Sequence, residues 1–106
     1  MRLGPLEQRV LDALWARDEN ARVRDLQPSF PDIAYTTLMT TLDRLHRKGM
    51  LDRVLDGRAF AYRPRGTRAE TMLSFFLDEV GTLDAESLDA LERLVRERRR
   101  ALEEQS

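Results

Sequence analysis

Three threonines lie where a helix would expose them, and their side chains suit contact with the edges of nucleic-acid bases. Thr36, Thr37 and Thr40 belong to the stretch AYTTLMTTLDRLHRKG. A threonine hydroxyl can donate or accept a hydrogen bond, and its methyl group can contact a thymine methyl. Threonine is a mediocre helix former, so a helix that needed only solubility would more usually carry Glu, Lys or Ala there. The three threonines are therefore candidates for contacting base edges.

An amphipathic helix over residues 34–48 must position these threonines. Its apolar side chains recur three or four positions apart, and Gly49 follows as a stop signal. They are Tyr35, Leu38, Leu42 and Leu45. At about 100° per residue, Thr36 and Thr40 fall on the opposite face. Arg44 and Arg47 continue along that exposed side, where they would reach backbone phosphates. Tyr35 could hydrogen-bond a phosphate or pack at the start of the helix.

A short hairpin is expected directly after this helix, over residues 51–62. Two apolar runs flank Asp56-Gly57, a dipeptide typical of a two-residue type I′ turn. Pro64 should end the second strand, because proline cannot donate to a ladder. Arg58 follows the turn and can extend to a phosphate or into the minor groove. Arg53 is a weaker backbone candidate, since strand alternation could point it away. A helix followed by a hairpin with a basic tip is the order of a recognition helix and a wing.

The residues before this segment predict two helices and a short strand. A first helix should begin near Pro5, and Trp15 should pack under the hairpin rather than bind a ligand. Residues 21–23 predict a short strand beside the hairpin, and residues 23–27 predict a second helix that Pro28 cuts off. Asp32 is expected to supply the capping oxygen of the helix over 34–48.

The stretches AYTTLMTTLDRLHRKGML and DGRAFAYRP resemble the penicillinase-repressor family of winged-helix regulators, over about residues 4–66. The resemblance implies a dimeric transcriptional repressor on a palindromic operator, with Thr36, Thr37 and Thr40 at the base edges. It also implies an upstream sensor or protease pathway. Met39 stands where relatives place a long polar side chain, so the sequence preference is expected to differ. Copper-responsive relatives sense through C-terminal cysteines, which this chain lacks.

Two further helices are predicted after Gly66, and both are too apolar on one side to stand alone. Asp84 is a good N-cap for the second of them. Their apolar stripes supply the residues expected at a dimer interface: Leu73, Phe76, Leu77, Val80, Leu88, Leu91 and Val95. A second copy of the chain would cover both stripes. The alternative is a monomer whose C-terminal helices fold back.

The net charge of −1 conceals an uneven distribution over the 106 residues. Residues 1–66 hold 12 basic and 9 acidic side chains, giving +3, whereas residues 67–106 hold 6 and 10, giving −4. Phosphate attraction depends on local charge, so the basic part can still bind DNA. With no cysteine, neither disulfides nor a thiolate metal site can form, and no cofactor or metal is expected. No apolar run is long enough to span a membrane, so a cytoplasmic protein is expected.

The sequence therefore predicts a mainly α fold with a small β-hairpin. Residues 1–66 would form a winged helix-turn-helix domain, and residues 67–106 a C-terminal helical dimerisation segment. The expected function is sequence-specific binding of double-stranded DNA by a homodimeric repressor. The alternative is a winged-helix module that docks proteins without touching DNA. An enzyme is not expected, because no Ser/His/Asp set, phosphate-cradling Gly loop or metal cluster is present in the sequence.

Overall fold

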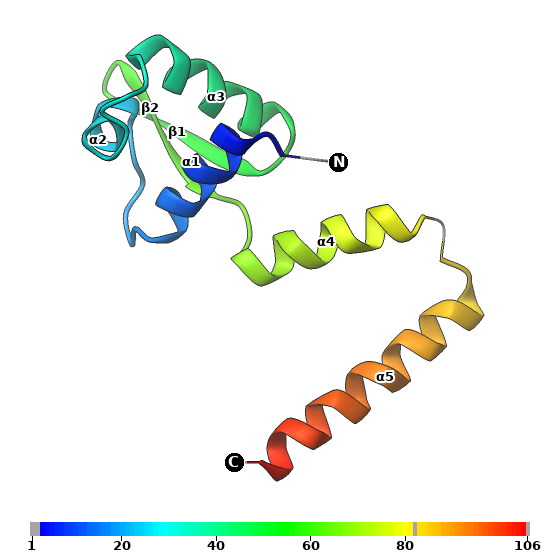
Figure 1. Ribbon diagram of the computed structural model, residues 1–106. Coiled ribbons are helices and arrows are strands. Elements are labelled where there is room, and N and C mark those ends of the chain that lie inside the picture. The colour runs from blue at the N-terminus through cyan, green and yellow to red at the C-terminus, as the bar shows by residue number, and fades with distance from the viewer. Residues whose placement is uncertain (1–2, 82, 106) are drawn as a thin grey trace. The chain divides into compact units, whose positions relative to one another are not determined.

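The structure is a computed structural model that describes residues 3–81 and 83–105, apart from the side chains of residues 79 and 80. Its elements are α1 (Pro5–Trp15), α2 (Val23–Leu26), the 3-10 helix η1 (Gln27–Ser29), α3 (Tyr35–Arg47), β1 (Leu51–Asp56), β2 (Ala59–Pro64), α4 (Arg68–Val80) and α5 (Ala85–Glu104) (Figure 1). The predicted fold class, mainly α with one small hairpin, is confirmed. The chain divides into two compact units, residues 1–75 and 76–106. The expected domain boundary after residue 66 stays a prediction.

α3 is held by one apolar face in the core of the first unit. Leu38, Leu42 and Leu45 have no exposed surface, and they pack in one cluster with Val10 and Leu11 of α1. At the end of α3, the N–H of Gly49 donates to the carbonyl of His46, and the N–H of Met50 donates to the carbonyl of Leu45. Gly49 has a φ of 82°, so the helix ends in a Schellman motif that favours glycine. The helix predicted over 34–48 is confirmed.

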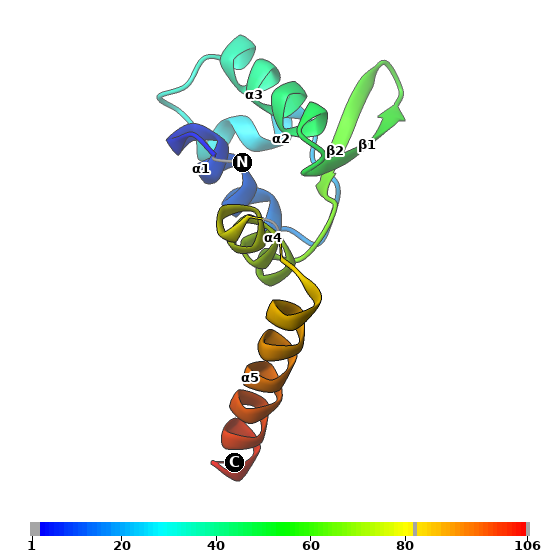
Figure 2. The same ribbon diagram turned by 90° about the vertical axis from the view of Figure 1, so that its right-hand side faces the viewer.

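β1 and β2 form the antiparallel hairpin, called the wing below. Figure 2 shows the wing beside α3. Asp56 pairs with Ala59, so the two central turn residues are Gly57 and Arg58. Gly57 has a φ of 69°, and no non-glycine residue in the described ranges has a positive φ. The predicted type I′ turn over Asp56-Gly57 is therefore wrong. Glycine at the first central position, followed by a negative φ, is the pattern of a type II′ turn.

The segment before α3 departs from prediction in three places. The second helix ends at Leu26 and continues as η1, in which Pro28 supplies no N–H for an α-helical bond. The N-cap of α3 is Ala34, which makes no side-chain hydrogen bond. The carboxylate Oδ1 of Asp32 instead lies 3.6 Å from the guanidinium Nη2 of Arg9. The predicted capping by Asp32 is therefore wrong. The strand expected at 21–23 is reduced to one bridge, in which Ala21 exchanges two backbone hydrogen bonds with Tyr62.

Trp15 ties the first helix to the start of α4. Its indole Nε1 donates to the carbonyl oxygen of Gly66 at 3.0 Å, and its ring packs against the core. The guanidinium of Arg68 lies 4.8 Å from the centre of that ring and 2.7 Å from a carboxylate oxygen of Asp12. Trp15 is thus a packing residue, as predicted, and its contacts fix where the chain leaves the wing.

In the second unit, α5 is a single helix of 20 residues. The carboxylate of Asp84 accepts the N–H of Ser87 at 2.8 Å, which confirms the predicted cap. Most of the side chains predicted at a dimer interface are exposed: Leu73, Phe76 and Leu77 of α4, and Leu88 and Val95 of α5. The side chain of Leu91, also predicted there, is half-buried. The Val80 side chain, also predicted at a dimer interface, lies outside the described residues. No helix in the described part of the chain is long and apolar enough to cross a membrane.

Candidate nucleic-acid interface

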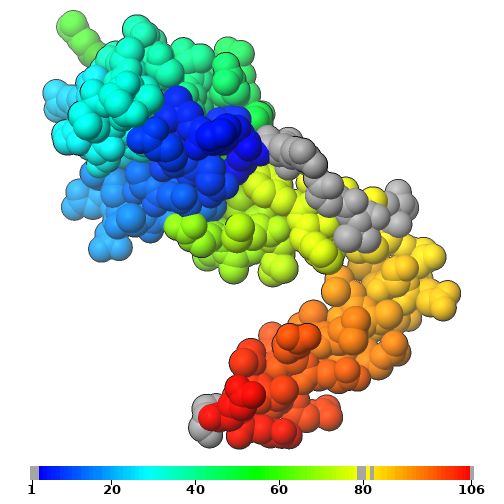
Figure 3. All heavy atoms as spheres, viewed as in Figure 1, coloured from blue at the N-terminus to red at the C-terminus, as the bar shows by residue number. Residues whose placement is uncertain are grey.

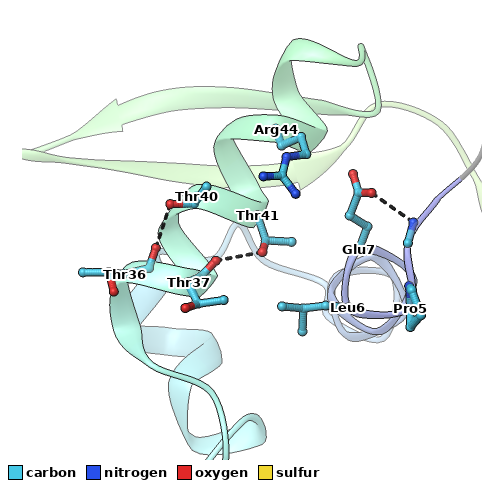
Figure 4. A pocket seen from close by; sticks show the side chains of 9 residues that line it. Pro5, Leu6, Glu7, Thr36, Thr37, Thr40, Thr41 and Arg44 are labelled. Atoms are coloured by element: carbon cyan, nitrogen blue, oxygen red, sulfur yellow. Dashed lines mark hydrogen bonds between the residues drawn. The ribbon is translucent and has the colours of Figure 1, made fainter.

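Thr36, Thr37 and Thr40 form an exposed surface on α3, called the threonine face below (Figure 4). The hydroxyl of Thr40 donates to the carbonyl of Thr36 at 2.9 Å. The hydroxyl of the buried Thr41 donates in the same way to Thr37 at 2.7 Å. Because its proton points back along the helix, Thr40 offers its surroundings an acceptor oxygen and a methyl group.

A first groove of about 430 Å³ runs between the threonine face and the start of α1. Figure 4 shows Pro5, Leu6 and Glu7 on one side of it and Arg44 on the other. Figure 4 shows the guanidinium of Arg44 beside α3, at the edge of the groove. Arg44, predicted from sequence to contact phosphate, therefore borders the exposed face of α3 on the α1 side.

A second groove of about 370 Å³ lies on the other side of α3, between that helix, the wing and the start of α2. Its lining combines three arginines with exposed or buried apolar groups: Arg22, Arg24, Arg58, Tyr35, Met39 and Phe60, among others. Figure 3 shows the green turn of the wing projecting from the surface. Arginine beside aromatic and apolar surface suits a phosphate–sugar backbone better than a small neutral ligand.

The arginines near α3 differ in how far they are already neutralised. Arg47 lies 3.0 Å from Asp43, although its side chain is 79% exposed. Neither Arg24 nor Arg58 forms a salt bridge within the described ranges, and both are exposed. An exposed guanidinium without a carboxylate partner is the group best prepared to meet a phosphate. Arg58 was predicted from sequence, whereas Arg24 was not.

Arg53 joins the wing to α3. Its guanidinium lies 3.3 Å from the carboxylate of Asp43 and 4.1 Å from the centre of the Phe60 ring. The contact with Asp43 holds β1 against α3. The contact with Phe60 stacks the guanidinium on an aromatic ring of the neighbouring strand β2. The phosphate contact predicted for Arg53 stays a prediction. The geometry gives Arg53 a structural part in setting the distance between the wing and α3.

Glu7 and Lys48 form an ion pair beneath the first groove. The ammonium of Lys48 lies 2.8 and 2.9 Å from the two carboxylate oxygens of Glu7, and the Gly4 N–H donates to one of them at 3.0 Å. Burial alone raises the pKa of Glu7, but the hydrogen bonds from Lys48 and Gly4 and the charges of Lys48 and Arg44 outweigh it. The pKa of Glu7 therefore lies below its ordinary value. The pair links the first turn of α1 to the end of α3.

Three of these residues, Arg24, Glu7 and Lys48, were not singled out from sequence. Lys48 and Glu7 are 41 positions apart, and no periodicity connects them. Arg24 carried a weak signal, because it lies in the short helix that precedes α3 in a helix-turn-helix.

The order α1–α2–α3 followed by a hairpin, with an exposed polar face on α3 between two grooves, defines a winged helix-turn-helix. Solved structures with this fold include a MarR family protein from Bacillus stearothermophilus, with a TM-score of 0.55 and 18% identity, covering 96% of this chain and 76% of that one. The peroxide sensor PerR of Streptococcus pyogenes gives a TM-score of 0.51 and 21% identity, covering 62% of this chain and 49% of that one. At these identities the likeness concerns the fold alone.

The chain belongs to the penicillinase repressor family, whose sequence model matches residues 3–72. It is 40% identical over 80 residues to the transcriptional regulator BlaI of Mycobacterium tuberculosis, in both strain CDC 1551 and strain H37Rv. The match covers 73% of this chain and 58% of each relative, so this chain spans little more than half of their length. The family is one of transcriptional repressors and not of enzymes.

Proposed function

We propose that this protein is a homodimeric transcriptional repressor that binds a palindromic operator through α3 and the wing. The observation that carries the proposal is the position of the threonine face between two grooves, each bordered by arginine. A helix with short polar side chains fits the major groove, and cations on both sides of it fit the two phosphate backbones that border that groove.

In this arrangement the threonine face contacts base edges. Thr40 presents an acceptor and a methyl group, a combination that suits the amino group of adenine and the methyl group of thymine. Met39, exposed on the edge of the second groove, adds apolar contact and no hydrogen bond. We therefore expect a half-site that contains A·T pairs.

The phosphate contacts divide between the two grooves. Arg44 would reach one backbone from the α1 side of α3, with Arg47 further along the helix. Arg24 and Arg58 would reach the other backbone from the second groove, where Tyr35 can add a hydroxyl. A single module of this size makes few such contacts and binds weakly at cellular salt. Two modules joined through the apolar faces of α4 and α5 would contact two half-sites at once.

The cytoplasm is the compartment in which we expect this activity, since the DNA target lies there. An upstream sensor or protease pathway is the expected source of induction, by likeness to the family. The rival proposal, a module that docks proteins without contacting DNA, requires the arginines of both grooves to face a protein partner instead.

A footprint on the chain's own promoter region separates these proposals. We expect two protected segments whose centres lie about 10 base pairs apart, or a simple multiple of that spacing, because paired recognition helices meet the same side of the duplex. An unprotected ladder at low salt, at micromolar protein, would instead favour the protein-docking module.

Thr40→Val and Arg58→Ala should weaken binding in different ways. Thr40→Val keeps the methyl group and the shape but removes the acceptor, so it should lower operator affinity about fivefold and leave random DNA unchanged. Arg58→Ala should weaken both duplexes and reduce the slope of log K against log salt by about 1 per protomer, because one phosphate contact is lost. Fluorescence anisotropy with operator and random duplexes, at several salt concentrations, measures both. Equal losses on both duplexes for both variants would contradict this division.

A further inference from the structure

The carboxylate of Asp43 is shared between two arginines that come from different elements. Its Oδ1 lies 3.3 Å from Nη1 of Arg53 in β1, and its Oδ2 lies 3.0 Å from Nε of Arg47, one turn further along α3. The side chain of Arg53 is 28% exposed, whereas that of Arg47 is 79% exposed. The pair with Arg53 is therefore the more enclosed of the two, and it joins α3 to the wing.

On the wing, the guanidinium of Arg53 also joins β1 to β2. Its central carbon lies 4.1 Å from the centre of the Phe60 ring, and that ring meets the Tyr62 ring edge-on at a centre-to-centre distance of 6.5 Å. Tyr62 is buried and belongs to the core cluster. A guanidinium that is stacked on a ring and paired with a carboxylate is held from two sides. A continuous series of contacts therefore runs from α3 through both strands of the wing to the core.

The outer half of the wing depends on such contacts for its position. Residues 54–60 are all exposed, and a two-stranded hairpin is only marginally stable by itself. Within the described ranges, ion pairs brace this half from two sides. One is the Asp43–Arg53 pair. The other joins Arg22, just before α2, to Asp56 at 3.8 Å, and it is looser because the Asp56 side chain is 60% exposed. The angle between the wing and α3 is therefore set mainly by the Asp43–Arg53 pair.

We propose that Asp43 and Arg53 are positioning residues, which fix the wing relative to α3 and so let the chain discriminate its operator from other DNA. The inference rests on the proposed function and adds two residues that act without contacting bases. On the operator, the threonine face fixes the position of the protein on the duplex, so Arg58 meets its phosphate only if the wing stands at a set angle. On random DNA no such position is required, and a loosely held wing still finds a phosphate, because phosphates repeat along the duplex.

A role through charge alone predicts the opposite result for Asp43. A carboxylate beside a DNA-binding face repels phosphates, so Asp43→Asn would then strengthen binding to every duplex. Asp52 of β1 is a matched control for this effect. Its carboxylate lies 3.0 Å from Nε of Arg65 and 4.0 Å from Nε of Arg63, and its exposure of 38% resembles the 36% of Asp43. Asp52→Asn therefore removes the same charge from a carboxylate that also holds two arginines, but it leaves the wing attached to α3.

The ratio of operator affinity to random-DNA affinity separates positioning from charge, because a change of charge alters both affinities alike. The operator probe is a duplex that spans the segment protected in the promoter footprint. We expect Asp43→Asn and Arg53→Gln each to lower this ratio about tenfold, and the double variant to lower it no further, since both changes break one bridge. Asp52→Asn should leave the ratio at the wild-type value. A ratio unchanged by Asp43→Asn, or losses that multiply in the double variant, would overturn the proposal.

The position of the wing can also be measured without DNA. Residual dipolar couplings of backbone N–H groups report the orientation of each bond, and in the wild type those of residues 54–60 should fit the same alignment as those of α3. Asp43→Asn should reduce the couplings of residues 54–60, because the wing then swings, whereas Asp52→Asn should not. Couplings that stay unchanged in Asp43→Asn would overturn the positioning role, whatever the affinities. Reduced couplings in Asp43→Asn, together with a wild-type chain that leaves no footprint, would support that role and refute the repressor.

Discussion

Replacing Lys48 by alanine is expected to lower the free energy of unfolding by about 3 kcal/mol. The side chain of Glu7 is only 9% exposed, and Lys48 places its ammonium within 2.9 Å of both carboxylate oxygens. Without Lys48, the nearly buried carboxylate of Glu7 keeps, among the described residues, the Gly4 N–H and the more distant charge of Arg44. Urea unfolding followed by circular dichroism measures the loss.

Two controls make this prediction specific. Arg47→Ala removes the neighbouring cation, whose pair with Asp43 is largely exposed, and should cost less than about 0.5 kcal/mol. The double variant Glu7→Met/Lys48→Met replaces both charges by apolar groups and should recover most of the loss. A Lys48→Ala variant as stable as the wild type would show that the pair does not anchor α1 to α3.

The same pair predicts how stability depends on pH. The pKa of Glu7 lies below its ordinary value of 4.5 in the folded chain. Its stabilising effect is therefore complete above the unfolded pKa and is lost as the pH falls through the lower folded pKa. Between neutral pH and about pH 3, Glu7→Gln should lose less stability than the wild type. A wild-type decline no steeper than that of Glu7→Gln would contradict the assignment.

The second large effect is expected on DNA affinity when the dimer is broken. Val95→Asp places a carboxylate in the centre of the α5 stripe and should lower operator affinity about a hundredfold, because two linked half-site contacts become one. Arg100→Asp introduces the same group on the charged side of α5 and should leave the dimer intact. Sedimentation velocity and anisotropy measure assembly and affinity together. A monomeric Val95→Asp variant that binds operator within about threefold of the wild type would refute the need for two copies.

Local signals in the sequence were enough to predict the helix α3 and the wing. The apolar spacing from Leu38 to Leu45 and the glycine at 49 defined α3, because both act within a few residues. The turn was predicted in the right place with the wrong centre. Asp56-Gly57 favours a type I′ turn in isolation, but the register of β1 against β2 pairs Asp56 with Ala59 and moves the turn one residue on.

Contacts between distant residues were beyond what the pattern could predict. The Glu7–Lys48 pair and the Arg53–Asp43 contact join separate elements, and neither follows from periodicity or from turn chemistry. The prediction that Asp32 caps α3 was wrong for a similar reason. The carboxylate of Asp32 lies beside the guanidinium of Arg9 in α1, and it does not cap the start of α3. The base-edge and phosphate residues remain predictions, supported by their position around the two grooves.

The most direct test of the account is the mass of the complex with DNA. A labelled duplex from the chain's own promoter region, mixed with the purified chain and excess random duplex at physiological salt, can be followed by sedimentation velocity. We predict a complex of two chains per duplex that survives the competitor. Free duplex at every protein concentration, or a complex that random DNA removes as readily as specific DNA, would contradict it.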